Sequence, residues 1–246
     1  MSSNYHGLQS SLRGNVTKDL FIQGAYTWSK AINMTDEDGW VSVGWNWDPV
    51  VARNRATAGY DRTQVFSLSY TYDLLVGKGK AFLNTSNKAV NLIIGGWKSG
   101  GIYSAFSGTP FNVTADATRL NAPGNIQTAD QIGDFTYLNG AGTDTPYFAA
   151  SSFATPTPAG GAIRFGTTGR NRFRGPGRAV LDFNLRKEFV VTERLSVQFR
   201  AEAQNLTNTP WFSNPSANVD GANFGLITGT NSLSERQIRF GVRVSF

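Results

Sequence analysis

The sequence lacks cysteine and contains a single histidine, His6, among its 246 residues. Without cysteine the chain can form neither a disulfide nor a thiolate metal site. A hydrolase triad needs a histidine held by a third group, and metal sites usually gather several histidines or carboxylates. No nucleophile elbow, phosphate-binding loop or paired-histidine motif accompanies His6. We therefore expect no enzymatic activity, no metal site and no cofactor.

Charged residues and long apolar runs are also scarce. Charged residues make up 16% of the chain, and its apolar runs are only a few residues long, which excludes a transmembrane helix. The first residues, Met1–His6, lack the basic-then-apolar pattern of a signal peptide, which an exported barrel would need. We therefore expect the chain to be a fragment of a longer protein or not to be exported. The net charge of +6 is interpreted as basic loops rather than as a site for an acidic partner.

The sequence is rich in glycine and aromatic residues, which favours strands and turns. Five segments alternate between apolar and polar residues with a period of two, as half-exposed β-strands do. They cover residues 20–29, 64–74, 180–189, 195–204 and 236–246. Two weaker strands are expected at about 5–13 and 91–106. Glycines in the second leave open which of its residues share a face, because a bulge could switch them.

The two faces of the five clear strands differ sharply in charge. The apolar faces carry one charged residue, Lys187, which lies near enough to a turn to reach a membrane interface. The opposite faces carry Asp73, Asp182, Arg186, Glu188, Arg200, Glu202, Arg239 and Arg243. A lysine or arginine at the bilayer midplane costs about 2–4 kcal/mol, so the apolar faces suit contact with lipid.

Alternation alone also fits a soluble sandwich, in which the apolar faces form the core. The lengths of the links favour a membrane. Links are short at 14–19 and 190–194, intermediate at 75–90, and long at about 30–62, 107–179 and 206–235. Short periplasmic turns alternating with long extracellular loops produce this order. A structureless stretch of about 70 residues is also hard to place in a compact soluble domain.

The fold predicted from these patterns is all-β: an antiparallel transmembrane β-barrel segment of about seven strands. Tyr26 and Trp28 would lie near the outer end of their strand, and Tyr70 and Tyr72 near the inner end of theirs. Aromatic residues at both ends match the girdles that flank a lipid-facing band. Closed bacterial barrels normally have an even number of strands, so we expect seven strands to be part of a larger barrel.

Several motifs carry a resemblance to a known family. The most specific are Gly169–Gly177 (GRNRFRGPG), Leu181–Phe189, Thr192–Arg194, Gln198–Glu202, Asn205–Asn208 and Arg239–Gly241, with weaker matches at Ala25–Lys30 and Gly108–Phe111. Their order and spacing cover nearly the whole chain. Together they resemble Oar-like TonB-dependent outer-membrane receptors.

The resemblance implies both an architecture and a role. Full-length members have a signal sequence, a carboxypeptidase-regulatory-like domain, a plug and a barrel of about 22 strands. They import large or scarce solutes with energy delivered through TonB. Residues 1–246 would be the C-terminal part of such a barrel, with no plug and no signal peptide, and would not transport anything alone.

The same resemblance implies a location and a set of partners. The location is the bacterial outer membrane. The expected partners are outer-membrane lipid or lipopolysaccharide, the barrel-assembly machinery, and TonB and the plug in the full-length protein only. Two alternatives stay open at this stage: a soluble β-sheet module that binds a ligand such as a carbohydrate, and a small passive outer-membrane channel.

Three groups of residues are candidate functional sites. The C-terminal strand, with its apolar residues Ile238, Phe240, Val242, Val244 and Phe246, is expected to close the barrel and to be recognised during assembly. Five inward charges are expected to pair across the strand ladder into a lumen network: Asp182, Arg186, Glu188, Arg200 and Glu202. Trp40, Trp45 and Trp47 could stack on a ligand, brace their own loop or enter the outer leaflet.

A basic and aromatic segment precedes the third clear strand, at 180–189. It contains Arg164, Arg170, Arg172, Arg174 and Arg178 together with Phe165 and Phe173. Nucleic-acid surfaces mix these residue types, but the glycines and Pro176 make this segment turn-rich. We expect the arginines to hydrogen-bond with loop carbonyls and lumen carboxylates, and we expect no nucleic-acid partner.

Overall fold

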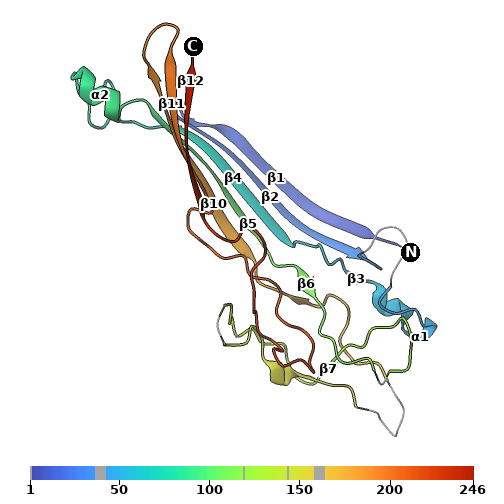
Figure 1. Cartoon of the computed structure of the whole chain (residues 1–246). Helices are drawn as coiled ribbons and strands as arrows, with labels where there is room; N and C mark the ends of the chain where they lie inside the picture. Colours follow the sequence, from blue (N-terminus) through green and yellow to red (C-terminus); the bar gives the residue numbers. More distant parts are fainter. Residues whose placement is uncertain (1, 37–42, 119, 143, 158–163) are drawn as a thin grey trace.

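The computed structural model describes residues 2–36, 43–118, 120–142, 144–157 and 164–246. Seven long antiparallel strands form one curved sheet, and the long loops gather at one end of it (Figure 1). The long strands are β1 (Asn4–Thr17), β2 (Leu20–Asn33), β4 (Gln64–Asp73), β5 (Trp97–Phe106), β10 (Arg178–Val190), β11 (Ser196–Gln204) and β12 (Gln237–Ser245).

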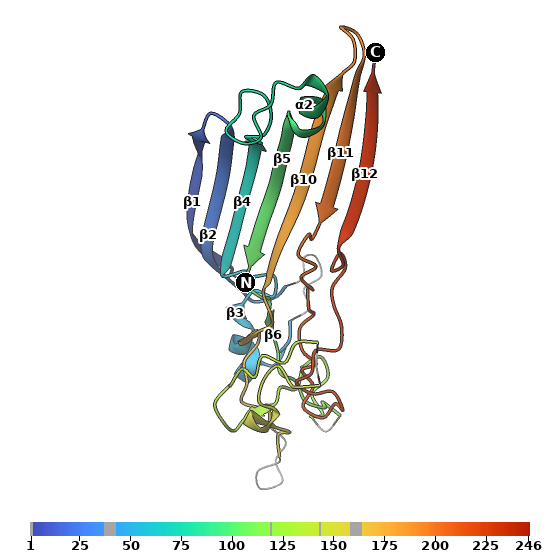
Figure 2. The same ribbon diagram turned by 90° about the vertical axis from the view of Figure 1, so that its left-hand side faces the viewer.

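Each long strand pairs with the next long strand along the chain, so the spatial order is β1-β2-β4-β5-β10-β11-β12 (Figure 2). A short strand, β3 (Ala56–Thr57), also pairs with β2. The sheet is open, because β1 and β12 are not paired with each other in the part of the chain described. All seven predicted strands are confirmed, and so is the antiparallel all-β fold.

The predicted strand at 91–106 needs one correction, because its first residues are helical. Helix α2 (Lys88–Ile94) begins after Asn87, whose side chain accepts hydrogen bonds from the N–H groups of Ala89 and Val90. Such an N-cap satisfies amide groups that a helix start leaves unpaired. The helix ends at Gly95, and Gly96 takes a φ of +74° that favours glycine. Strand β5 therefore begins only at Trp97.

The structure also settles which residues of β5 share a face. Tyr103 pairs with Leu68 of β4 and Leu181 of β10, so the odd-numbered residues of β5 lie on the apolar face. Gly101 is needed there because the ring of Tyr70 lies over it. A Cβ atom at Gly101 would be 2.6 Å from Cε1 of Tyr70. Glycine in this strand therefore makes room for a neighbouring aromatic ring.

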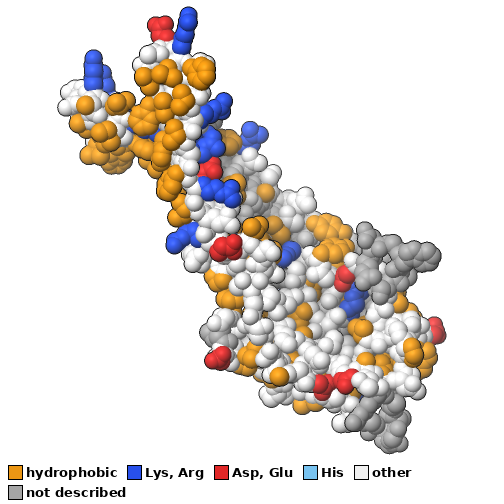
Figure 3. All heavy atoms as spheres, in the orientation of Figure 1, with side chains coloured by type: hydrophobic (Ala, Val, Ile, Leu, Met, Phe, Trp, Pro, Cys, Tyr) orange, Lys and Arg blue, Asp and Glu red, His pale blue; other side chains and the backbone are white. Residues whose placement is uncertain are grey.

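The apolar faces of the strands join into one continuous surface. Leu12 pairs with Gly24, which pairs with Leu68, and the same face continues through Phe199 and Val242. Aromatic residues lie at both ends, with Trp28 opposite Gln64 near the loops and Tyr72 opposite Leu20 near the turns. Figure 3 shows this surface over β10–β12 and α2, with lysines and arginines on the other side of the strands.

The main hydrophobic core lies in the loops rather than in the sheet. Its buried residues are Phe111, Val113, Ala129, Tyr147, Phe148, Phe153, Phe173 and Ile227. Short elements frame it, namely β6 (Pro110–Phe111) paired with β9 (Phe173–Arg174), β7 (Asp130–Gln131) paired with β8 (Phe153–Ala154), and a 3-10 turn, η2 (Ala150–Ser152). The described parts of the 107–179 stretch are thus folded, which corrects the expectation of a structureless loop. Its aromatic residues supply enough apolar surface for a core of its own.

The helices of the structure are short. Besides α2 there is one turn of helix, α1 (Asp48–Val51), which continues into a 3-10 turn, η1 (Ala52–Asn54). No helix among the residues described has the length and apolar character needed to cross a membrane.

Candidate functional site

The described parts of three long loops, 34–63, 107–177 and 205–236, pack together into what we call the loop cap (Figure 1). Aromatic rings join the loops. Phe135 stacks on Phe173 with ring centroids 4.5 Å apart, and Phe148 stacks on Phe111 at 5.9 Å. Phe224 of the third loop meets Phe148 edge-on at 5.2 Å. Pairs with these geometries stabilise by about 0.5–1.5 kcal/mol beyond their area.

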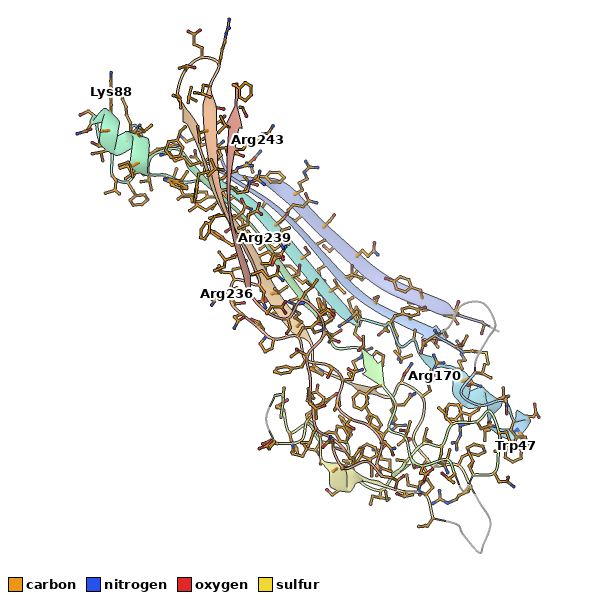
Figure 4. The ribbon with its side chains drawn as sticks, in the orientation of Figure 1. Trp47, Lys88, Arg170, Arg236, Arg239 and Arg243 are labelled. Carbon is orange, nitrogen blue, oxygen red and sulfur yellow. The ribbon has the colours of Figure 1, made fainter. Side chains whose placement is uncertain are left out.

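Arg170 fastens the second loop to the first from a buried position (Figure 4). Its guanidinium donates hydrogen bonds to the backbone carbonyls of Asn33 and Asn54 and lies 3.1 Å from the carboxylate of Asp36. A planar guanidinium has several donors in fixed directions, so one side chain can satisfy several buried acceptors at once. Arg170 therefore joins the end of β2 to two separate points of the first loop.

Arg174 and Arg164 make comparable contacts. Arg174 forms an ion pair with the buried carboxylate of Asp61 and donates to the carbonyl of Gly108 at 3.0 Å. Asp61 also accepts a hydrogen bond from the backbone N–H of Ala31, at 2.6 Å. Arg164 forms an ion pair with Asp130 at 2.5 Å.

The expected structural role of the arginines is therefore confirmed for these side chains. Arg178 also follows it, donating to the carbonyl of Leu233 at 2.9 Å. Their carboxylate partners, however, belong to the loops and not to the lumen.

Local contacts shift the pKa values of three groups of the loop cap, Asp130, Asp36 and Tyr147. Hydrogen bonds from Arg164 lower the pKa of Asp130 more than its burial raises it. Burial tends to raise the pKa of Asp36, but bonds from Asn33, Gly59 and Asn171 together lower it. Burial raises the pKa of Tyr147 to about 12. Within the described residues, no group of three or more acidic or histidine side chains is placed to hold a metal ion.

The three candidate tryptophans have different environments. Trp40 lies outside the described residues. Trp45 is fully buried, and its backbone exchanges two hydrogen bonds with the side chain of Asn54. Trp47 is 53% exposed at the far end of the loop cap, where its ring stacks on Phe165 at 6.0 Å (Figure 4). Trp45 therefore braces its loop, and Trp47 presents a ring to solvent.

Two adjoining hollows open where the loop cap meets β1 and β2. The first, of about 780 Å³, is lined by Trp28, Lys30 and Arg172 among other residues. The second, of about 610 Å³, shares Lys30 and Arg172 and adds Arg53 and Arg55. No acidic residue lines either one, and neither Lys30 nor Arg172 forms an ion pair with a described residue. We call this surface the basic hollow.

The inward charges do not pair across the ladder as expected. The register places Arg186 opposite Arg200 on one side and opposite Lys98 on the other, so like charges are neighbours. The reason is the tight turn, which pairs Val190 with Ser196 and thereby fixes every later pair. Of the five residues, all described, only Arg200 and Glu202 form an ion pair, at 3.2 Å along one strand. Glu188 instead lies opposite Gln198.

Other contacts of this face were absent from the sequence-based expectation. The carboxylate of Asp182 accepts a hydrogen bond from the N–H of Asn205 at 2.8 Å. Arg239 of β12 lies opposite Glu202, and Arg243 lies opposite Gln198. Figure 4 shows both arginines on the side of the sheet away from the apolar face. The alternation of β12 already placed them there, so the signal was present in the sequence.

The C-terminal strand completes the apolar face as expected. Ile238, Phe240, Val242 and Val244 lie opposite Ala203, Ala201, Phe199 and Val197 of β11. The rings of Phe199 and Phe240 stack at 6.3 Å. Phe246 follows the end of β12 and is fully exposed. The strand thus presents an apolar row that no other described element covers.

A family model for the outer membrane beta barrel domain matches residues 1–239 of the chain. The chain belongs to this family. The outer-membrane barrel domain accounts for the sheet, whose apolar face meets lipid while its charged face lines the interior. The protein is therefore located in the outer membrane, and the alternative of a soluble β-sheet module is set aside. No curated protein and no solved structure matches the chain.

Proposed function

We propose that this outer-membrane barrel domain is the C-terminal barrel part of an Oar-like TonB-dependent receptor. In the intact protein it would serve the energised uptake of a large or scarce solute, in a transport rather than a catalytic role. The receptor-like motifs between Gly169 and Asn208 support this proposal. The observation that carries it is the folded loop cap.

A passive channel needs an open mouth, whereas a receptor needs a shaped surface on which a dilute solute can bind. The loop cap has such a surface because its loops are tied to one another. The N–H of Asp116 donates to Asp220 at 2.7 Å, and the side chains of Asn125 and Asn46 are bonded at 2.6 Å. Binding residues commonly lie on loops held in place by a rigid scaffold. In this proposal the solute-facing features are Trp47 and the basic hollow.

The interior face offers a second line of support. Lys98, Arg186 and Arg200 form a row of cations on three neighbouring strands. Asp73 lies 3.3 Å from Lys98 and Glu202 lies 3.2 Å from Arg200, so Arg186 is the member of the row without an ion pair among the described residues. Like charges directly opposite each other destabilise a sheet unless an anion lies near them. A plug inside the barrel would supply carboxylates at this position. The edges β1 and β12 would pair with further strands of the intact barrel.

The proposal can be tested on the intact protein with potassium chloride as the probe. Reconstituted in a planar bilayer, a plugged receptor should show no steady conductance, and it should bind the purified periplasmic domain of TonB. A steady open conductance would support the passive channel and overturn the proposal. Absence of TonB binding by folded protein would overturn it as well.

A further inference from the structure

The link between β4 and β5 has a fold that the barrel wall itself does not require. Residues 75–86 form a compact loop, and α2 follows at the end of the sheet opposite the loop cap (Figures 1 and 2). Two side chains of the apolar face hold the helix. Nε1 of Trp97 donates to the carbonyl of Ile93 at 2.9 Å, and Nζ of Lys187 reaches the same carbonyl at 3.1 Å. Helix α2 therefore rests on the lipid side of the wall.

The contacts of Lys187 explain why its charge is tolerated on the lipid side of the wall. Its ammonium group also donates to the carbonyls of Leu92 and Gly95, and the residue is only 4% exposed. These carbonyls are among those that the last turn of a helix leaves unpaired, and the helix dipole favours a cation there. Lys187 was expected to extend to the interface, but α2 covers it instead.

Helix α2 buries none of its own residues. Ile93 is 69% exposed, and Val90 and Leu92 are exposed beside it. Phe82 and Leu83 of the preceding loop are also exposed, and Leu83 has a φ of +49°, a conformation that costs a leucine energy. Water would not stabilise so short and so apolar a helix. These side chains add apolar surface to the lipid-facing side of the wall.

The charged residues of the β4–β5 link also fit a location at the membrane surface. Residues 74–96 contain Lys78, Lys80 and Lys88 and no acidic residue. Lys80 pairs with Asp19 of the neighbouring turn at 2.8 Å. The side chain of Lys88 points away from the loop cap (Figure 4). Apolar residues facing the acyl chains, with lysines at headgroup level, are the arrangement by which interfacial helices bind anionic phospholipid.

We propose that residues 75–94 are a membrane anchor that lies in the periplasmic leaflet of the outer membrane. Its apolar side chains would enter the boundary between headgroups and acyl chains by about 5–10 Å. The occupant of this surface is phospholipid, because the surface continues the lipid-facing band of an outer-membrane barrel. The anchor would fix the height of β4 and β5 in the bilayer. It does not depend on which solute the protein transports.

Residues 1–246 contain no cysteine, so single cysteines introduced there can be labelled once any cysteine elsewhere in the intact protein has been replaced with serine. Ile93→Cys places an environment-sensitive fluorophore on the apolar side of α2. Ser86→Cys, at an exposed polar position of the same link, is the matched control. The intact protein is reconstituted in vesicles of phosphatidylethanolamine and phosphatidylglycerol, with or without bromine on the acyl chains.

We expect the label at position 93 to emit at shorter wavelength and to be quenched by brominated acyl chains, while the label at 86 behaves as in water. Lys187→Met, added to Ile93→Cys, should reduce the quenching in protein that still shows heat-modifiable migration of a folded barrel. Equal, water-like emission at 93 and 86 would overturn the proposal. So would quenching at 93 by an aqueous quencher and not by lipid.

Discussion

The strand wall and the loop cap use apolar side chains in opposite ways. The wall turns Tyr103 and Phe240 outward, both exposed, and is held by its backbone ladders. The loop cap turns Phe148 and Phe173 inward and adds buried ion pairs such as that of Arg174 with Asp61. A strand surrounded by lipid needs no core beneath it, whereas loops in water must build one. The solvent on each side thus decides where the apolar residues go.

The largest effect should come from opening the core of the loop cap. Phe148→Ala removes a fully buried ring that meets Phe111, Phe135, Phe153 and Phe224. Such truncations cost about 3–5 kcal/mol. We expect the loops to become sensitive to protease added outside the cell, while heat-modifiable migration of the barrel stays unchanged. Loss of both together would show that the two regions fold as one unit.

An arginine placed on the lipid face or on the interior face of one strand should distinguish the two faces of the wall. Tyr103→Arg puts a cation on the lipid side near the middle of β5, which costs about 2–4 kcal/mol at the midplane. Ile102→Arg is the matched control, since Ile102 is exposed on the interior face opposite Asp182. The amount of folded protein in outer membranes should fall for the first variant only. Equal losses would contradict the assignment of faces.

Acid should loosen the loop cap selectively. Arg164 lowers the pKa of Asp130 from its ordinary value of 3.8. Because the folded-state value is the lower one, this contribution to stability is complete above the ordinary value and is lost as the pH falls through the lowered one. The protection of the loop-cap amides against hydrogen exchange, measured relative to the intrinsic exchange rate at each pH, should therefore fall in that window. Asp130→Asn should remove this part of the pH dependence, and an unchanged profile would assign it to other groups.

The smallest effect is expected at Arg200 on the interior face. The lumen network expected from the sequence predicts that charge reversal at Arg200 reduces the amount of folded barrel. The register changes this prediction, because Arg200→Glu loses its pair with Glu202 but places a carboxylate opposite Arg186. Both side chains of the native pair are half-exposed, and such pairs contribute about 0–1 kcal/mol. Barrel levels close to the unmodified protein are expected, and a large loss would reveal a partner that depends on Arg200.

The sequence predicted the wall well because period-two alternation is a local property of each strand. This alternation does not predict which residues of neighbouring strands lie opposite each other. The like-charge neighbours Arg186 and Arg200 follow from a register that the turn sets, and the face of Gly101 follows from the ring of Tyr70. Helix α2 was missed because its apolar run suits a strand as well. The cap at Asn87 and the break at Gly95 were the available signals.

The loop cap was less predictable because its contacts join residues far apart in the chain. The sequence around Asp61 does not indicate that it pairs with Arg174, and the sequence around Asn33 does not indicate that it accepts a hydrogen bond from Arg170. Nothing in the sequence distinguished the roles of Trp40, Trp45 and Trp47. Only tertiary packing separates the buried Trp45 from the exposed Trp47.

The contact between Lys187 and α2 also orders events in time. A seven-residue helix does not persist alone, and its cap is supplied by a lysine on β10, far along the chain from the helix. Lys187 can therefore reach the end of α2 only after β10 has paired with β5 in the native register, which brings Lys187 beside Trp97. A strand shifted by one residue would carry the ammonium group to the other face. The contact between Lys187 and α2 thus forms only in a correctly paired wall.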